Sequence, residues 1–134
     1  MTKQEGFKQA AYDMGTAQII FDAGRRIYTV FMCHLAIEKA LKGLYQVRLG
    51  KTPPKVHNLV YLAERIGLSL PGGLHDFMIM LNRLSIPTRY PDELGQALRK
   101  FGKKRTQTIL DKSKELLKWL KSQSRKPSGS CDNA

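Results

Sequence analysis

The chain has 134 residues, of which 42% are hydrophobic and 25% are charged. This length suits one domain with one core, and this composition excludes a chain that is disordered throughout. The formal net charge is +12 and the sequence pI is about 10.0, which favours an acidic ligand or partner such as a nucleotide, RNA or an acidic protein.

No feature of the sequence predicts export or membrane insertion. The longest apolar stretch, residues 27–37, contains a histidine and is too short to cross a bilayer. The N-terminus lacks the basic start and apolar block of a signal peptide, so we expect a cytoplasmic protein with no membrane contact. Cys33 and Cys131 have no partner at metal-ligand spacing, so we expect no disulfide framework, metal site or cofactor.

Apolar residues recur at helical spacing along most of the chain, and the alternation typical of strands is nearly absent. The pattern predicts a first helix over residues 3–23 and a second over residues 26–49, which Gly50 ends. A third, shorter helix is expected to begin near residue 57 or 58 and to end around Gly67.

A fourth helix is predicted over residues 74–85, followed by a turn with two prolines. A fifth element is expected to begin near residue 91 or 92, to falter at Gly102 and to continue to about residue 123. Residues 124–134 lack apolar spacing and are predicted to be disordered. The sequence therefore predicts an all-α domain over residues 3–123, an up-and-down antiparallel bundle of four main helices plus a short fifth helix.

Basic residues are concentrated toward the C-terminus. Residues 1–94 carry 12 Lys/Arg against 8 Asp/Glu, whereas residues 95–134 carry 11 against 3. The densest cluster, residues 99–105, is a candidate for nucleic-acid contacts; the alternative is a solvated basic face of a long helix. Its basic residues are Arg99, Lys100, Lys103, Lys104 and Arg105.

Two histidines lead to separate predictions. His34 lies on the apolar stripe of the second helix, where we expect a packed side chain that bonds to Glu38 one turn later. His57 follows a Pro-Pro loop at a helix start, where it either orders the loop or acts on a ligand. Glu38 and Lys42 form a common one-turn pair, so their spacing alone does not predict a site.

Three segments together resemble the HEPN family, the higher-eukaryote and prokaryote nucleotide-binding domains. They are "FMCHLAIEKALKGLY" (31–45), "VHNLVYLAERIGL" (56–68) and "LNRLSIPTRYPDE" (81–93). They occur in the family's order, and the helical pattern around them extends the resemblance over nearly the whole domain. The matching residues are Phe31, Ala36, Glu38, Lys39, Ala40, Leu41 and Lys42, then His57, Asn58 and Leu59, then Arg89, Tyr90, Pro91 and Asp92.

The resemblance implies a homodimer that works beside a separate minimal nucleotidyltransferase, in a toxin–antitoxin-like pair, and binds a nucleotide or RNA. It also implies a phosphate-binding site, in which Arg89 would pair with Glu38 or Asp92 while Lys42 remains available to a phosphate. The alternative is that the same cluster only locks the turn to the bundle. The implied site residues are Arg89, Lys42, Glu38, His57, Tyr90 and Asp92.

Other HEPN proteins are metal-independent ribonucleases whose arginine is followed by a histidine after four to six residues. A ribonuclease reading would use His57 as general acid/base and Arg89 for phosphate stabilisation. However, no arginine in this chain has a histidine at that spacing. We therefore expect a binding module without intrinsic activity rather than an enzyme.

Overall fold

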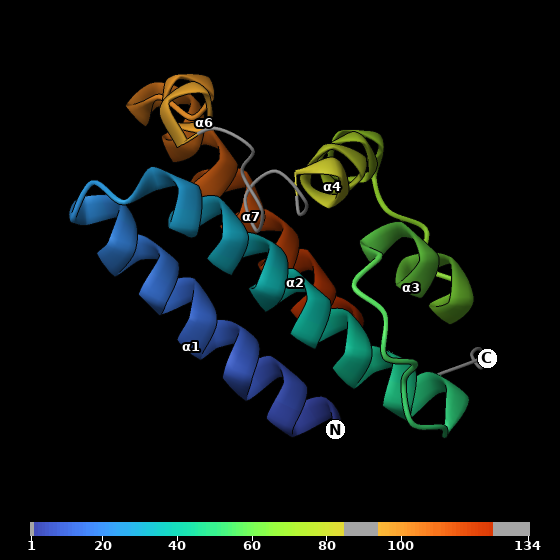
Figure 1. Ribbon diagram of the computed structural model, residues 1–134. Coiled ribbons are helices and arrows are strands. Elements are labelled where there is room, and N and C mark those ends of the chain that lie inside the picture. Colours follow the sequence, from blue (N-terminus) through green and yellow to red (C-terminus); the bar gives the residue numbers. More distant parts are fainter. Residues whose placement is uncertain (1, 85–93, 125–134) are drawn as a thin grey trace.

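The computed structural model describes residues 2–84 and 94–124, and within these residues all regular structure is helical (Figure 1). The all-α prediction is therefore confirmed. Asn58 and Gly67 flank the third helix as caps, and the second helix has the predicted bounds. The helices are α1 (Lys3–Asp22), α2 (Arg26–Leu49), α3 (Leu59–Ile66), α4 (Gly72–Arg83), α6 (Leu94–Lys100) and α7 (Lys103–Gln123).

Helices α1 and α2 form an antiparallel hairpin whose backbones approach closely at two glycines. A Cβ atom added to Gly6 would lie 2.8 Å from the carbonyl oxygen of Lys39 and 2.9 Å from the Cα of Gly43. Farther along the hairpin, the ammonium of Lys39 lies 2.8 Å from the buried carboxylate of Asp13. Because both obstacles at Gly6 are backbone atoms, only glycine allows this helix separation.

Helix α7 runs in the same direction as α2 and packs against the α1–α2 hairpin. At one end, Arg26 Nε donates to the carbonyl of Phe101 at 2.7 Å. At the other end, Arg48 Nη2 donates to the carbonyl of Gln123 at 3.4 Å, and Lys3 Nζ donates to that of Ser124 at 3.2 Å. These contacts hold the three long helices side by side (Figure 1).

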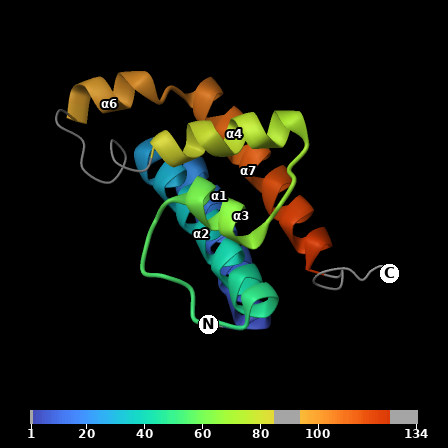
Figure 2. The same ribbon diagram turned by 90° about the vertical axis from the view of Figure 1, so that its right-hand side faces the viewer.

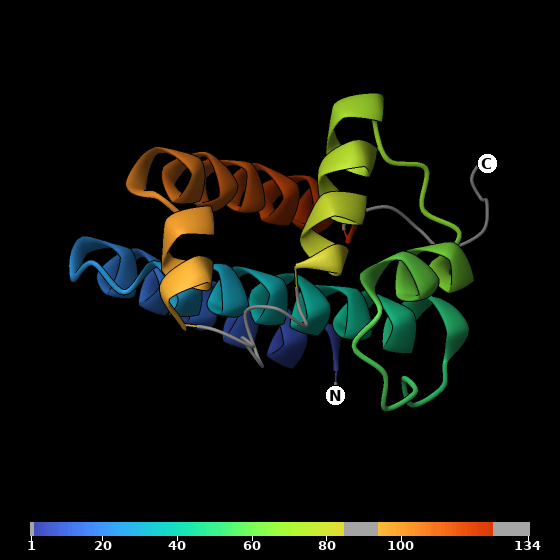
Figure 3. The same ribbon diagram turned by 45° about the horizontal axis from the view of Figure 1, so that its top comes forward.

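Helix α4 runs across this layer instead of along it (Figures 2 and 3). Among the described residues the predicted bundle of four main helices is not confirmed in detail, since three long helices lie side by side and α4 runs across their layer. The expected start of the fifth element near residue 91 or 92 lies outside the described residues, as does the tail beyond Ser124.

The predicted fifth element is two helices, α6 and α7, because the chain breaks between them. Phe101 is buried at the break, and its carbonyl accepts from both Arg26 and the Thr106 hydroxyl. Gly102 is extended (φ −65°, ψ 167°) and begins α7 as its N-cap. The sequence predicted that the fifth element falters at Gly102, and the structure has a complete break between two helices there.

Helix α2 is the centre of the core. Thirteen of its 24 residues are buried, and they face α1, α3 and α7 on different sides. The sequence predicted one packed face, whereas α2 is covered on several. This burial is what removes His34 and Glu38, two polar residues of α2, from solvent.

Candidate functional site

Glu38 is the centre of a polar cluster inside the fold. It is 3% exposed, and its carboxylate accepts from Lys42 Nζ at 3.0 Å. His57 Nδ1, nineteen residues away along the chain, lies 2.9 Å from one carboxylate oxygen and 3.1 Å from the other. The buried His34 adds its Nδ1 at 3.7 Å, within ion-pair range but beyond hydrogen-bond distance. One buried carboxylate is thus surrounded by three nitrogen-bearing side chains.

The start of α3 holds His57 in place. Asn58 is the N-cap of α3, and its side chain accepts from Asn82 Nδ2, on α4, at 3.2 Å. Asn82 Oδ1 in turn accepts from the backbone N–H of Leu59 at 2.8 Å. Because these bonds tie α3 to α4, the residue immediately before the cap is fixed in position over α2.

In the imidazole of His57, Nδ1 contacts the Glu38 carboxylate and Nε2 points away from it. An ionised carboxylate only accepts hydrogen bonds, so Nδ1 must carry the proton that it shares with Glu38. The tautomer is thereby set, and Nε2 accepts a proton in the neutral ring or donates one in the charged ring. With the His57 side chain 58% exposed, Nε2 is accessible to a ligand.

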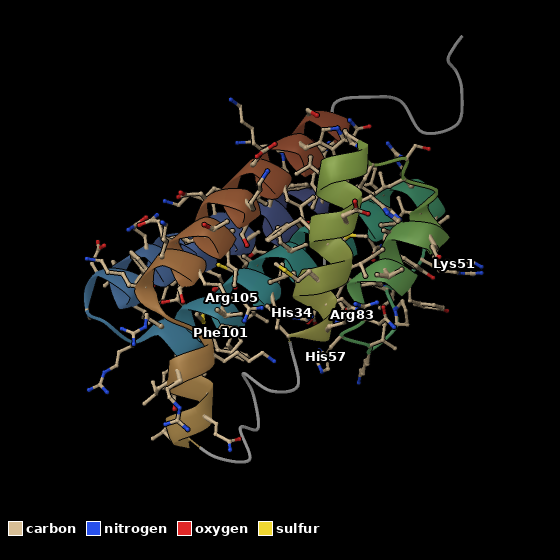
Figure 4. The ribbon with its side chains drawn as sticks, turned by 90° about the horizontal axis from the view of Figure 1, so that it is seen from above. His34, Lys51, His57, Arg83, Phe101 and Arg105 are labelled. Carbon is tan, nitrogen blue, oxygen red and sulfur yellow. The ribbon has the colours of Figure 1, made fainter. Side chains whose placement is uncertain are left out.

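Arg83 adds a guanidinium at the same end of α4. It directly follows Asn82, whose side chain bonds to Asn58, the neighbour of His57. Figure 4 shows Arg83 and His57 at the same end of α4. Arg83 is exposed and forms no ion pair within residues 2–84 and 94–124. Since Lys42 balances the charge of Glu38, Arg83 adds a positive charge to the described part of this surface.

Family and fold comparisons agree with this architecture. The sequence matches the family model of the HEPN domain over residues 4–123. The chain belongs to the HEPN family. The resemblance inferred from the three segments is therefore confirmed.

Two solved structures have the same fold as this HEPN chain. TT1696 from Thermus thermophilus is 27% identical, with a TM-score of 0.77 covering 90% of this chain and 96% of that one. ST0689, an archaeal HEPN homologue, is 24% identical, with a TM-score of 0.72 covering 92% of this chain and 98% of that one. At that identity, the second likeness shows the fold alone. No curated protein matches the chain.

The structure brings two of the three HEPN segments together at Glu38. Glu38 and Lys42 come from the segment on α2, and His57 comes from the segment before α3. Lys42 is 17% exposed, and its ammonium donates to the Glu38 carboxylate. Arg89, Tyr90, Pro91 and Asp92 lie outside the described residues, so the predicted contacts of that turn stay predictions.

All five basic residues of the cluster at residues 99–105 are exposed, and Arg105 also contacts the corner between α6 and α7. The Arg105 guanidinium lies 5.2 Å from the centroid of the Phe101 ring and donates to the carbonyl of Lys100 at 3.2 Å. Arg105 therefore braces the corner between α6 and α7. Arg99, Lys100, Lys103 and Lys104 are the remaining exposed basic residues of the cluster.

Asn82 and Arg83 were not among the site residues that the sequence predicted. Both lie in the third HEPN segment, but they precede the turn on which the prediction rested. Only the hydrogen bonds of Asn82 across to α3 associate them with His57.

Two further findings concern the described residues. No group of three or more His, Cys, Asp or Glu side chains there is arranged to hold a metal ion. No helix in that part of the chain combines the length and apolar character needed to cross a membrane.

Proposed function

We propose that this HEPN protein is a phosphate-binding module for a nucleotide or RNA, with its site at His57 and Arg83 over the buried Glu38. It acts as a homodimer beside a separate minimal nucleotidyltransferase, in a toxin–antitoxin-like pair. Lys42 and Arg89 are further phosphate contacts that the family resemblance implies.

The observation that carries the proposal is the 2.9 Å contact between His57 Nδ1 and the Glu38 carboxylate. A carboxylate without a cationic partner would repel a phosphate. The Glu38 carboxylate, however, is paired with Lys42 and contacted by His57. The guanidinium of Arg83 then supplies donors, and a planar guanidinium matches two phosphate oxygens at once. The outward Nε2 of His57 adds a further donor when the imidazole ring is charged. The local charge is suited to an anion.

Exposed apolar side chains on α1 support the homodimer. Tyr12 and Ile19 are 79% and 69% exposed, and their seven-residue separation places them on one side of the helix. A second copy of the chain would remove this apolar surface from water. If Tyr12→Ser with Ile19→Ser leaves the mass in light scattering unchanged, this face is not the interface.

The partner is inferred from the family, since bacterial and archaeal HEPN proteins often work beside a minimal nucleotidyltransferase. Co-purification with the product of a neighbouring nucleotidyltransferase gene, in a fixed ratio, is the expected result. Absence of a complex between the two purified proteins would remove the partner from the proposal.

The phosphate site is tested by binding of a labelled oligonucleotide and of ATP at several salt concentrations. We expect Arg83→Gln to weaken binding by about tenfold and to lower the slope of log K against log salt by about 1. Arg65→Gln is the matched control, because Arg65 is an exposed arginine at the far end of α3. Equal affinities for wild type and Arg83→Gln would refute the site.

A ribonuclease is a second candidate, and one specific observation favours it. A histidine whose Nδ1 is held by a carboxylate and whose Nε2 faces solvent has the arrangement of a general base. In this reading Glu38 orients His57, and Arg89 stabilises the phosphate. RNA that stays intact with purified wild-type protein would exclude it, whereas cleavage lost in His57→Ala would establish it.

A further inference from the structure

A groove at the other end of α4 is separate from the Glu38 cluster. It has a volume of about 490 Å³ and lies between the start of α4 and the C-terminal half of α7. This volume is within the range of small-molecule pockets. Its lining includes Pro71, Gly73 and Leu74 from the α4 side and Lys118, Trp119 and Ser122 from α7.

The lining combines an aromatic plane with positive charge. Trp119, the only tryptophan in the chain, is partly buried against the core. Lys118 beside it is exposed and has no ion-pair partner in the described part of the chain. Lys112 and Glu115 also line the groove and form an exposed ion pair at 3.8 Å. Such a pair contributes little stability, so Lys112 can turn to a phosphate at small cost.

We propose that this groove binds a base of single-stranded RNA. Trp119 stacks on the base, while Lys112 and Lys118 contact the adjoining phosphates. Stacking on an aromatic side chain together with lysine contacts to the backbone is how proteins hold single strands without reading their sequence. The two lysines outnumber the single Glu115, so the charge of the groove complements a polyanion.

The groove also indicates which ligand the phosphate site takes, an oligonucleotide instead of a mononucleotide. This step rests on the proposed function. His57 and Arg83 lie at the end of α4 and the groove at its start, about 18 Å apart at 1.5 Å per residue for a 12-residue helix. A mononucleotide cannot reach both places. The ligand that uses both is therefore an oligonucleotide.

Gly73 provides a variant that blocks the groove without disturbing the core. A Cβ atom on Gly73 meets no atom within 4 Å, and Gly73 lines the groove, so a leucine side chain there would fill part of the groove. Gly72 has the same freedom but does not line the groove, which makes Gly72→Leu the matched control. Circular dichroism should show both variants to be as helical as wild type.

The experiment follows the fluorescence of Trp119 during titration with a short oligouridylate, with AMP and with oligoglutamate. We expect only the oligouridylate to quench Trp119 at low concentration. Removing one stacked base should weaken this binding about tenfold in Gly73→Leu, while Gly72→Leu binds as wild type does.

Each other outcome overturns the proposal in a distinct way. Unchanged Trp119 fluorescence, or wild-type affinity in Gly73→Leu, would show that no base enters the groove. Equal quenching by AMP would make the ligand a mononucleotide, and equal quenching by oligoglutamate would assign the groove to an acidic protein. Oligonucleotide binding that depends on Arg83 but leaves Trp119 fluorescence unchanged would keep the phosphate site and reject the groove.

Discussion

The contact between α1 and α2 leads to a prediction about Gly6→Ala. The new Cβ would lie 2.8 Å from the carbonyl oxygen of Lys39 and 2.9 Å from the Cα of Gly43. Ordinary van der Waals contacts between non-bonded heavy atoms begin at about 3.5 Å. The two helices must therefore separate by roughly half an ångström to admit the new methyl group. Neither obstacle can rotate away, because both are backbone atoms.

Two opposing effects set the magnitude. Alanine in a helix is more stable than glycine by about 0.5–1 kcal/mol, and a methyl group forced into a packed contact costs about 1–3 kcal/mol. We therefore expect Gly6→Ala to lower the free energy of unfolding by about 0.5–2 kcal/mol. Gly15→Ala, on the same helix with no atom within 4 Å of its Cβ, should raise it by about 0.5–1 kcal/mol.

A third variant, Gly43→Ala, is expected to have a stability between those of wild type and Gly6→Ala. A Cβ on Gly43 would lie 3.2 Å from the Lys3 carbonyl oxygen and 3.3 Å from the Gly6 Cα, which is tight but less so than at Gly6. The expected order of stability is Gly15→Ala, wild type, Gly43→Ala and then Gly6→Ala.

Urea unfolding followed by circular dichroism measures the order through the transition midpoint, with the slope m expected to stay constant. A Gly6→Ala protein as stable as Gly15→Ala would mean that the helices are farther apart than described, and the reasoning would fail.

Three more perturbations test contacts of the fold. Asn82→Ala removes the acceptor for the Leu59 N–H, so we expect a loss of about 1–2 kcal/mol and faster amide exchange at the start of α3. Arg26→Met keeps the length of the side chain but leaves the Phe101 carbonyl without this donor, which should cost about 1–3 kcal/mol in thermal unfolding; an unchanged melting temperature would contradict it. Burial raises the pKa of Cys33 from 9.0 to about 11, so the folded protein retains this proton more strongly than the unfolded chain. The resulting stability is complete below pH 9 and is lost as pH rises toward 11; wild type should therefore weaken more than Cys33→Ala over that interval in alkaline unfolding, and parallel curves would exclude the effect.

The parts of the fold that could be predicted from the sequence are those that depend on residues close together in the chain. The apolar spacing of α2 predicted its bounds, and Gly50, with φ 62°, ends it as expected. Asn58 caps α3 through a bond to a backbone N–H three residues ahead. Such features involve neighbours within one or two helical turns, so the sequence contains them directly.

The path of α4 and the corner at Phe101 could not be read in the same way. An amphipathic helix shows which face is buried but not the angle at which it crosses its neighbours, because that angle depends on the side chains of both partners. The corner depends on the Arg26 donor, which is 75 residues away from the carbonyl that it contacts. No local pattern contains such a contact.

The candidate site divides along the same line. By itself the sequence determined the helical class, the bounds of α2, the basic character and the one-turn pair of Glu38 and Lys42, because each follows from short-range spacing or composition. Only the tertiary structure decided that Glu38 is buried, that His57 reaches it and that Arg83 lies near them. The physical reason is that burial and long-range hydrogen bonds arise from packing α3 against α2 and α4 against α3 and α7, and packing joins residues that the chain keeps apart.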